Sequence, residues 1–305
     1  MAANCEMSSN PLVRKMLKFA VLTDDDCRLL EQLSANPREV GPRTDLIREG
    51  YKPADVHLIL EGFACRYKVQ PSGARNIMAY LVPGDFCDLH VFVLREMDHS
   101  LGTLSQCTVV DISRKSILEL LERPAIARAF WVAAMVDEAT LREWLVNLGG
   151  REAAERVSHL LCELLFRLRA VGLADDDSYT LPLTQAELAD TTGLSDVHMN
   201  RILQRLRAEN LIMLRSNELV ILDAQRLIAF SNFNPNYLHL QQLTGGAPCW
   251  GRKLYVTSSA EKRTIKSFRP SASVTSNRHS PPLQKRRPRS RMISPAMRTA
   301  CDCAT

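Results

Sequence analysis

Hydrophobic positions change their spacing several times along the chain, and each change predicts a different kind of element. Residues 12–37 carry leucines at helical spacing after Thr23 and a run of acidic residues, which predicts one or two short amphipathic helices. Residues 46–113 instead contain short β-rich segments, separated by glycines that lie 11 or 12 residues apart. Because that distance fits one strand and one turn, we predict a closed β-roll of about eight strands rather than an open meander. The expected strands include Val56–Leu60, Ala64–Val69, Asn76–Leu81 and Thr108–Ile112, and the glycines are Gly50, Gly62, Gly73 and Gly84.

A long helix is predicted after Pro124, because no glycine or proline occurs again before Gly149. This helix has two apolar seams. A helix with one seam packs on its own domain, so a second seam indicates a second partner. We therefore predict a homodimer through this helix, with a buried core helix as the alternative. The dimer-helix candidates are Ile126, Phe130, Ala133, Thr140, Leu141 and Trp144. The first seam comprises Ile126, Phe130, Ala133, Thr140 and Trp144, and the second comprises Trp131, Ala134, Leu141, Leu145 and Leu148.

The segment with the sharpest pattern follows a predicted hinge at Gly149-Gly150 and another amphipathic helix. Thr184 and Glu187 have the spacing of a capping box and open a short helix. Gly193 then stands where a sharp turn needs a residue without Cβ, and Ser195 caps a second helix. Two helices joined by a short turn with glycine predict a helix-turn-helix, whose second helix enters the DNA major groove. Its predicted inner face is Met199, Ile202, Leu203 and Leu206.

The outward side chains of the second helix fit DNA chemistry. Asn200 and Arg201 carry groups that bind adenine and guanine edges, while Arg205 and Arg207 lie where phosphates would be. The polar residues between Leu214 and Leu219 predict a hairpin that acts as a wing. The alternative is a solvated helical hairpin. The candidate DNA-binding residues are Thr184, Gln185, Ser195, Asp196, Val197, His198, Asn200, Arg201, Gln204, Arg205, Arg207 and Arg215.

This order of elements resembles the Crp/Fnr superfamily of bacterial transcription regulators over roughly residues 15–243. The resemblance is carried by Arg48–Gly50, Leu58–Gly62, Val82–Phe86, Arg151–Arg156, Leu183–Ser195 and Asn200–Leu203. It implies an α+β fold with a β-roll like that of cyclic-nucleotide-binding domains, a parallel dimer through the long helix, and a winged helix-turn-helix. Implied partners are an inverted-repeat operator, RNA polymerase and an unidentified small-molecule effector. The expected domains are 12–123 for the sensor, 124–149 for the dimerisation helix and hinge, 150–243 for DNA binding, and 244–305 as a disordered basic tail.

The β-roll departs from the members of the superfamily that bind cyclic nucleotides. Those members carry Gly-Glu after the Pro-Gly-Asp turn and an Arg some ten residues later. This chain has Cys87-Asp88 at the first place, and Asp98–Gly102 around the second. Because a phosphate buried against Asp88 without a cation would be costly, we predict no tight binding of cyclic AMP. The remaining effector-pocket candidates are Asp85, Cys87, Asp88, His99 and Ser100.

The cysteines do not match the superfamily's oxygen-sensing branch, which holds an iron–sulfur centre with an N-terminal cysteine cluster. The N-terminal region offers Cys5 and Cys27, and the thiols Cys65, Cys87 and Cys107 have no cluster spacing. We therefore predict no cofactor. The nine scattered cysteines predict reduced thiols rather than a disulfide framework.

The DNA-reading helix also departs from the superfamily pattern. Arg201 matches the arginine of the usual run, which implies one retained guanine contact. Val197 replaces the glutamate that accepts from cytosine, and it can offer only apolar contact to a thymine methyl. We therefore expect a half-site that differs from TGTGA and TTGAT.

Composition and charge limit the remaining alternatives. The 305 residues contain no apolar run near the roughly 20 that a membrane span needs, and no signal peptide, so we expect a cytoplasmic protein without membrane contact. The net charge of +5 combines +11 in residues 245–305 with −6 in residues 1–244. The basic tail is predicted not to fold, and it is either inert or adds salt-sensitive DNA affinity.

The runner-up function is a metal-dependent cupin-like enzyme, which is suggested by Gly84, His90, Glu96 and His99. Because Phe92 stands where one of the expected metal ligands should be, no enzyme is predicted.

Overall fold

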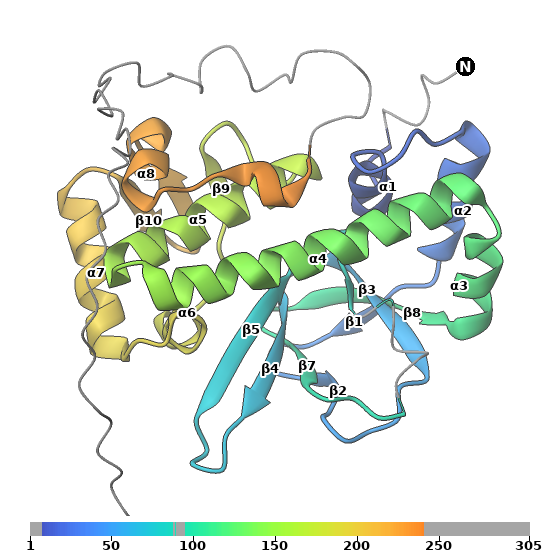
Figure 1. The fold of residues 1–305 in the computed structure, drawn as a ribbon, viewed down its shortest axis with the longest axis horizontal. Coiled ribbons are helices and arrows are strands. Elements are labelled where there is room, and N and C mark those ends of the chain that lie inside the picture. The colour runs from blue at the N-terminus through green and yellow to red at the C-terminus, as the bar shows by residue number, and fades with distance from the viewer. Residues whose placement is uncertain (1–7, 88, 90–94, 241–305) are drawn as a thin grey trace, which may run out of the picture. The chain divides into compact units, whose positions relative to one another are not determined.

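The computed structural model describes residues 8–87, 89 and 95–240, all of which belong to one compact unit (Figure 1). The predicted tail, Cys5, Asp88 and His90 lie outside these residues. Two short helices open the described chain: α1 spans Pro11–Met16 and α2 spans Asp24–Leu33. Thr23 and Asp26 form a capping box at the start of α2, so the acidic first turn predicted from the sequence is confirmed.

Two four-stranded antiparallel sheets form the predicted β-roll, which is thereby confirmed. Their orders are β1-β8-β3-β6 and β2-β7-β4-β5. The strands are β1 (Arg38–Val40), β2 (Asp45–Ile47), β3 (Asp55–Glu61), β4 (Ala64–Val69), β5 (Arg75–Leu81), β6 (Phe86–Cys87), β7 (Ser100–Thr103) and β8 (Cys107–Ser113). The glycines at 50, 62, 73 and 84 all have φ between +83° and +88°, as their turn positions require. At Gly62 a Cβ would also lie 2.1 Å from the Gln106 carbonyl oxygen, so any other residue would clash there.

The helix α3 (Arg114–Leu121) leads into the long helix α4 (Pro124–Gly150), which crosses the molecule beside the β-roll (Figure 1). The first apolar seam of α4 is buried in the core of the chain itself. The helix includes both Gly149 and Gly150 and ends at Arg151, whose backbone is extended. The glycine pair therefore forms the last two residues of α4 rather than interrupting it, and the break before α5 follows at residues 151–152.

The remaining elements form the winged helix-turn-helix region. They are α5 (Ala153–Ala170), β9 (Ser178–Thr180), α6 (Gln185–Thr192), α7 (Asp196–Ala208), β10 (Ile212–Arg215), β11 (Glu218–Ile221), α8 (Ala224–Ser231) and a 3₁₀ turn, η2 (Pro235–Leu238). The strands form one small antiparallel sheet in the order β10-β11-β9. Helix α5 is buried along most of its length and shares one hydrophobic core with Trp144 of α4 and Tyr80 of β5.

The described cysteines correct one prediction. Cys65, Cys87, Cys107 and Cys162 are free and buried, as expected for reduced thiols. Burial raises the pKa of Cys65 and of Cys162 to about 12, so neither is a reactive thiolate. Cys27, however, is disulfide-bonded, and the prediction was wrong for this residue. Sequence spacing alone does not say which sulfur atoms the fold brings within bonding distance.

Neither a membrane-spanning helix nor a metal-binding cluster occurs among the described residues of this chain. None of its described helices combines the length and the apolar character needed to span a membrane. Within residues 8–87, 89 and 95–240, no three His, Cys, Asp or Glu side chains are grouped so as to hold a metal ion.

Candidate nucleic-acid interface

Side-chain caps fix the start of both helices of the helix-turn-helix. The Thr184 hydroxyl accepts from the Glu187 amide at 3.2 Å, and the Glu187 carboxylate accepts from the Thr184 amide at 2.8 Å. Gly193 ends α6 in the left-handed region with φ +66°, and the Ser195 hydroxyl accepts from the His198 amide. The capping box, the glycine turn and the second cap are therefore confirmed as the sequence predicts them.

Helix α7 has one buried and one exposed face. The four predicted inner residues, Met199, Ile202, Leu203 and Leu206, are all buried. The opposite face presents a stripe at helical spacing, which we call the reading stripe: Val197, Asn200, Arg201 and Gln204. The Val197 side chain is 63% exposed at the start of this stripe. Asp196 and His198 are exposed on the first turn beside the stripe.

One hydrogen bond links the reading stripe to the first helix. The Asn200 Nδ2 atom donates to the Gln185 Oε1 atom at 2.9 Å. Gln185 is the first residue of α6 and is exposed, whereas Asn200 is half-buried. The amide of Asn200 is therefore held in one orientation by a neighbouring element.

The two predicted phosphate contacts of α7 have different surroundings. The Arg205 guanidinium pairs with Glu209 at 2.8 Å, one turn along the helix, and lies 5.8 Å from the centre of the Phe230 ring. Arg207 is exposed. The sequence did not indicate that Arg205 has partners within the protein.

The predicted wing is present as a two-residue hairpin. Strands β10 and β11 pair from Ile212 with Ile221 to Arg215 with Glu218. Ser216 and Asn217 both have positive φ, as a tight hairpin turn of the primed type needs. The hairpin places Arg215 at its exposed tip.

The back of α6 rests on the β-roll. Arg75 of β5 pairs with Asp190 of α6 at 2.8 Å. The Tyr80 hydroxyl, fully buried, bonds the Thr191 hydroxyl and donates to the Glu187 carbonyl oxygen. These contacts join residues more than 100 positions apart, and sequence reasoning missed them because neither strand nor helix carries a local signal of its partner.

Two family models match the two halves of this arrangement. Residues 155–230 match the Crp-like helix-turn-helix domain, and residues 37–124 match the cyclic nucleotide-binding domain. The chain belongs to the Crp/Fnr superfamily of transcriptional regulators. The resemblance stated from the sequence motifs is confirmed.

Known members show how far the similarity extends. The chain is 28% identical over 221 residues to the transcriptional activatory protein AadR of Rhodopseudomonas palustris, a match that covers 72% of this chain and 90% of that protein. It is 28% identical over 174 residues to the nitrogen fixation regulation protein FixK of Bradyrhizobium diazoefficiens, covering 57% and 72%. The solved structure of FixK2 from Bradyrhizobium japonicum matches with a TM-score of 0.58 at 21% identity, covering 64% of this chain and 96% of that chain. At that identity, the structural match supports the fold alone.

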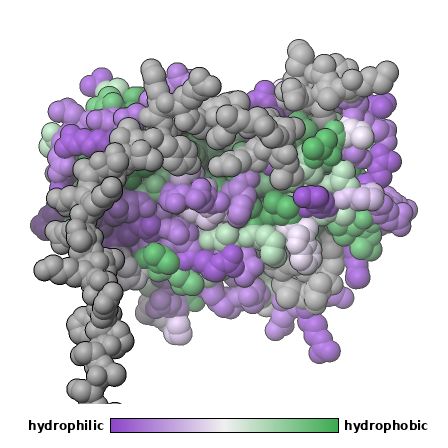
Figure 2. All heavy atoms as spheres, turned by 45° about the horizontal axis from the view of Figure 1, so that its top comes forward, coloured by the Kyte–Doolittle hydropathy of each residue, from purple (hydrophilic) through white to green (hydrophobic). Residues whose placement is uncertain are grey.

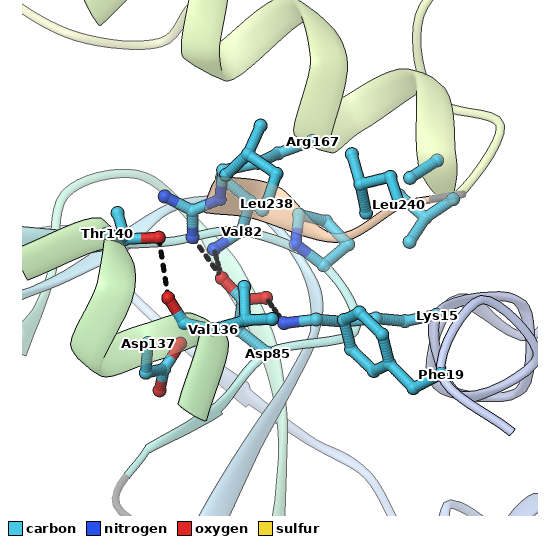
Figure 3. A pocket seen from close by; sticks show the side chains of 13 residues that line it. Lys15, Phe19, Val82, Asp85, Val136, Asp137, Thr140, Arg167, Leu238 and Leu240 are labelled. Carbon is cyan, nitrogen blue, oxygen red and sulfur yellow. Dashed lines mark hydrogen bonds and ion pairs between the residues drawn. The ribbon is translucent and has the colours of Figure 1, made fainter. Parts of the chain in front are cut away.

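In this Crp/Fnr protein, Asp85 forms two ion pairs, one of which joins the β-roll to the DNA-binding region. Figure 3 shows the carboxylate between Lys15 of α1 and Arg167 of α5, with both of which it forms ion pairs. One Asp85 oxygen also accepts from the Val82 amide at 2.8 Å. Burial opposes the charge, but Lys15 and Arg167 hold the pKa of Asp85 below its ordinary value. The adjoining cavity of about 20 Å³ has room for about one water molecule.

A second buried network continues from Arg167 toward α4 and η2. Glu163 is fully buried, and its carboxylate accepts from Arg167 at 3.2 Å, from the Trp144 indole at 3.0 Å and from the Tyr237 hydroxyl at 2.8 Å. Burial raises the pKa of Glu163, although Arg167 and these hydrogen bonds oppose the shift. The spacing of Trp144 predicts only that it lies in an apolar seam, and nothing in the sequence indicates this network.

The other effector candidates have different environments. Cys87 is fully buried in β6. The Ser100 hydroxyl of β7 accepts from the Glu49 amide at 3.0 Å, and the His99 ring bonds the Asp98 carboxylate at 2.7 Å. Asp88 lies outside the described residues. Asp85 and Ser100 thus bond to different parts of the molecule.

The second seam of α4 remains exposed. The face in Figure 2 shows hydrophobic side chains among polar ones. On α4 the large exposed apolar residues are Trp131, Met135, Leu141, Leu145, Val146 and Leu148, with Trp131 70% and Leu145 65% exposed. Of the six dimer-helix candidates, Leu141 is exposed, while Ile126, Phe130, Ala133, Thr140 and Trp144 pack within the chain's own core or are buried beside it. The surface open to a partner is therefore the second seam.

Proposed function

We propose that this Crp/Fnr-type DNA-binding regulator acts as a homodimer on an inverted-repeat operator, which it reads with the exposed stripe of α7. The observation that carries the proposal is the reading stripe itself: a capped, rigid helix that presents Val197, Asn200 and Arg201 outward. Arginine and asparagine match the edges of guanine and adenine in the major groove. Helix N-termini, exposed hydroxyls and basic side chains around the stripe suit phosphates, which sets the register on DNA.

The proposed contacts divide by role. Val197, Asn200, Arg201 and Gln204 face bases. The proposed positions around the DNA backbone are Thr184, Gln185, Ser195, Asp196, His198, Arg205, Arg207 and Arg215. Asp196 does not bind phosphate there; its negative charge interacts favourably with the positive N-terminal end of the α7 dipole. For Arg205, binding phosphate requires that its guanidinium leave Glu209.

The proposed dimer uses the second seam of α4. Helix seams with exposed Trp and Leu side chains are costly in water and are buried when two such helices pack together. Residues 12–123 then act as the sensor, 124–149 as the dimerisation helix and 150–243 as the DNA-binding domain. A signal in the β-roll would reach α6 through β5, whose residues Arg75 and Tyr80 contact that helix. The chemical nature of that signal, contact with RNA polymerase and a role for residues 244–305 are further parts of the proposal.

A binding selection with the full-length chain tests the proposed function. Random duplex DNA is enriched by repeated binding and sequenced, and we expect an inverted repeat whose half-site is neither TGTGA nor TTGAT. Arg201→Ala should weaken binding to the selected site by roughly 5- to 150-fold, because one bidentate base contact is lost. Gln32→Ala, an exposed glutamine on α2, is the matched control and should bind as the wild type does. Recovery of no enriched sequence by the wild type would refute the proposed function.

A further inference from the structure

We propose that Gln185 positions Asn200 as a reader of adenine, so that this pair of amides determines one A·T base pair in each half-site of the operator. The inference rests on the proposed function, and it assigns a specificity role to the first residue of α6. It starts from the hydrogen bond of 2.9 Å between the Asn200 Nδ2 and Gln185 Oε1 atoms.

Both amides stand on elements that cannot shift independently. Gln185 directly follows Thr184, whose capping box fixes the first turn of α6. Asn200 follows Met199, which is fully buried beneath α7. Gly193 sets the angle between the two helices in its left-handed conformation, and α6 and α7 pack against each other. The separation of the two side chains is therefore set by the fold rather than by the amides themselves.

The bond leaves Asn200 with the hydrogen-bonding groups that adenine requires. An asparagine amide has one oxygen acceptor and two N–H donors. The proposal requires that Gln185 take the N–H that points away from Oδ1, which leaves the other N–H and the Oδ1 atom as a neighbouring donor and acceptor. Adenine offers an acceptor at N7 and a donor at N6 in the major groove, which is the complementary pair. Guanine offers two acceptors there, so the Oδ1 atom would face the O6 atom without a hydrogen bond.

Gln185 also selects which way the amide faces. A free asparagine rotates about its last torsion and presents oxygen and nitrogen in either order. In the structure the Gln185 oxygen accepts from the Asn200 nitrogen, which places this nitrogen on the α6 side and the Asn200 oxygen on the opposite side. Fixing this orientation before DNA binds lowers the entropy cost of the base contact. Gln185 is thus a positioning residue that acts through Asn200.

The test measures discrimination at one base pair rather than overall affinity. The consensus from the binding selection supplies a duplex, and each A·T pair of the half-site is changed to G·C in both half-sites. We expect the wild type to lose roughly 5- to 150-fold in affinity at the pair that faces Asn200. Asn200→Ala should abolish the penalty at that pair and leave the penalties at other pairs unchanged. Gln185→Ala should reduce the same penalty severalfold.

A conservative variant separates positioning from simple backbone contact. Gln185→Glu keeps an oxygen that accepts from Asn200, so it should retain the adenine penalty although its negative charge weakens binding to every duplex. Unchanged thermal unfolding midpoints exclude misfolding of the variants. If Gln185→Ala weakens all duplexes equally and keeps the full adenine penalty, the residue is only a backbone contact and the inference is wrong. If Asn200→Ala leaves every penalty unchanged, the inference also fails while the proposed function stands. If the wild type enriches no site, the proposed function fails first, and the inference fails with it.

Discussion

Arg167 of α5 and Asp85 of the turn before β6 form a buried ion pair, with 2.5 Å between Nη2 and Oδ2. The same guanidinium donates to the Tyr80 carbonyl oxygen, so through Asp85 and Tyr80 one side chain of the DNA-binding region contacts two segments of the β-roll domain. It also donates to the Glu163 carboxylate on its own helix. Lys15 completes the charge balance around Asp85. A buried pair gives little net stability when it is intact, but removing one partner leaves an uncompensated charge. Replacing either Arg167 or Asp85 should therefore weaken the contact between α5 and the β-roll.

Arg167→Met should destabilise the chain by about 3–5 kcal/mol, since Asp85 and Glu163 both lose a buried cation. The lowered pKa of Asp85 means that its charge contributes stability above its ordinary pKa, and that this stability is lost as the pH falls through the lowered value. Without Arg167 that pKa rises, so acid unfolding should begin at a higher pH. Urea unfolding at several pH values between 3 and 7 measures both effects. Arg205→Met removes an exposed pair with Glu209 and is the matched control, with a much smaller change expected.

His159 should also make the folded chain less stable as the pH falls, but for a different reason: it is buried without charge. It is fully buried on α5, between the rings of Phe233 and Tyr237, at 5.0 and 6.1 Å between centres. Its Nε2 atom is 3.3 Å from Glu143 without hydrogen-bond geometry, and Arg151 pairs with that carboxylate. Burial, and then Arg151, lower the pKa of His159 to about 3.

The pKa of His159 is about 6.5 in the unfolded chain and about 3 in the folded chain. At pH values between these two, His159 is neutral in the folded chain and takes up a proton on unfolding. Stability from neutral His159 is thus complete above about pH 6.5 and falls by about 1.4 kcal/mol per unit of pH below it. His159→Leu removes this pH-dependent contribution to the free energy of unfolding. Between pH 6.5 and 4.5 the free energy of unfolding of the wild type should fall by about 2–3 kcal/mol more than that of the variant. Equal losses in chemical denaturation would show that His159 is protonated in the folded chain.

Local patterns predicted much of this molecule, and long-range pairings were not predictable. The Thr184 capping box, the left-handed Gly193 and the inner face of α7 depend on residues within a few positions of one another, so their spacing is visible in the sequence. The two seams of α4 were visible for the same reason. Which seam faces the chain's own core depends on residues far away, such as Glu163, whose carboxylate binds Trp144. The local motif around Asp85 likewise carries no signal of its ion pair with Arg167, 82 positions later.

Leu145→Glu should convert the proposed dimer to monomers. Leu145 is 65% exposed on the second seam of α4, and a carboxylate there would be desolvated beside its counterpart in the partner helix. We expect dimerisation to weaken at least about tenfold in sedimentation equilibrium, with affinity for an inverted-repeat duplex falling in parallel. Val69→Glu changes a residue of similar exposure on β4 and should remain dimeric. A Leu145→Glu protein that is as dimeric as the wild type would place the interface elsewhere.

Val197→Glu should change which base the first turn of α7 reads. The valine side chain is 63% exposed at the start of the reading stripe, and it can contact only the methyl group of thymine. A glutamate at the same position accepts from the cytosine amino group instead, and each such contact is worth about 1–3 kcal/mol of discrimination. Parallel binding selections with both proteins should therefore differ at one base pair of each half-site, from thymine to cytosine. Val197→Thr retains a methyl group and should retain thymine. If the glutamate variant enriches the same half-site as the wild type, Val197 does not face a base, and the bases are read farther along the helix by Asn200, Arg201 and Gln204.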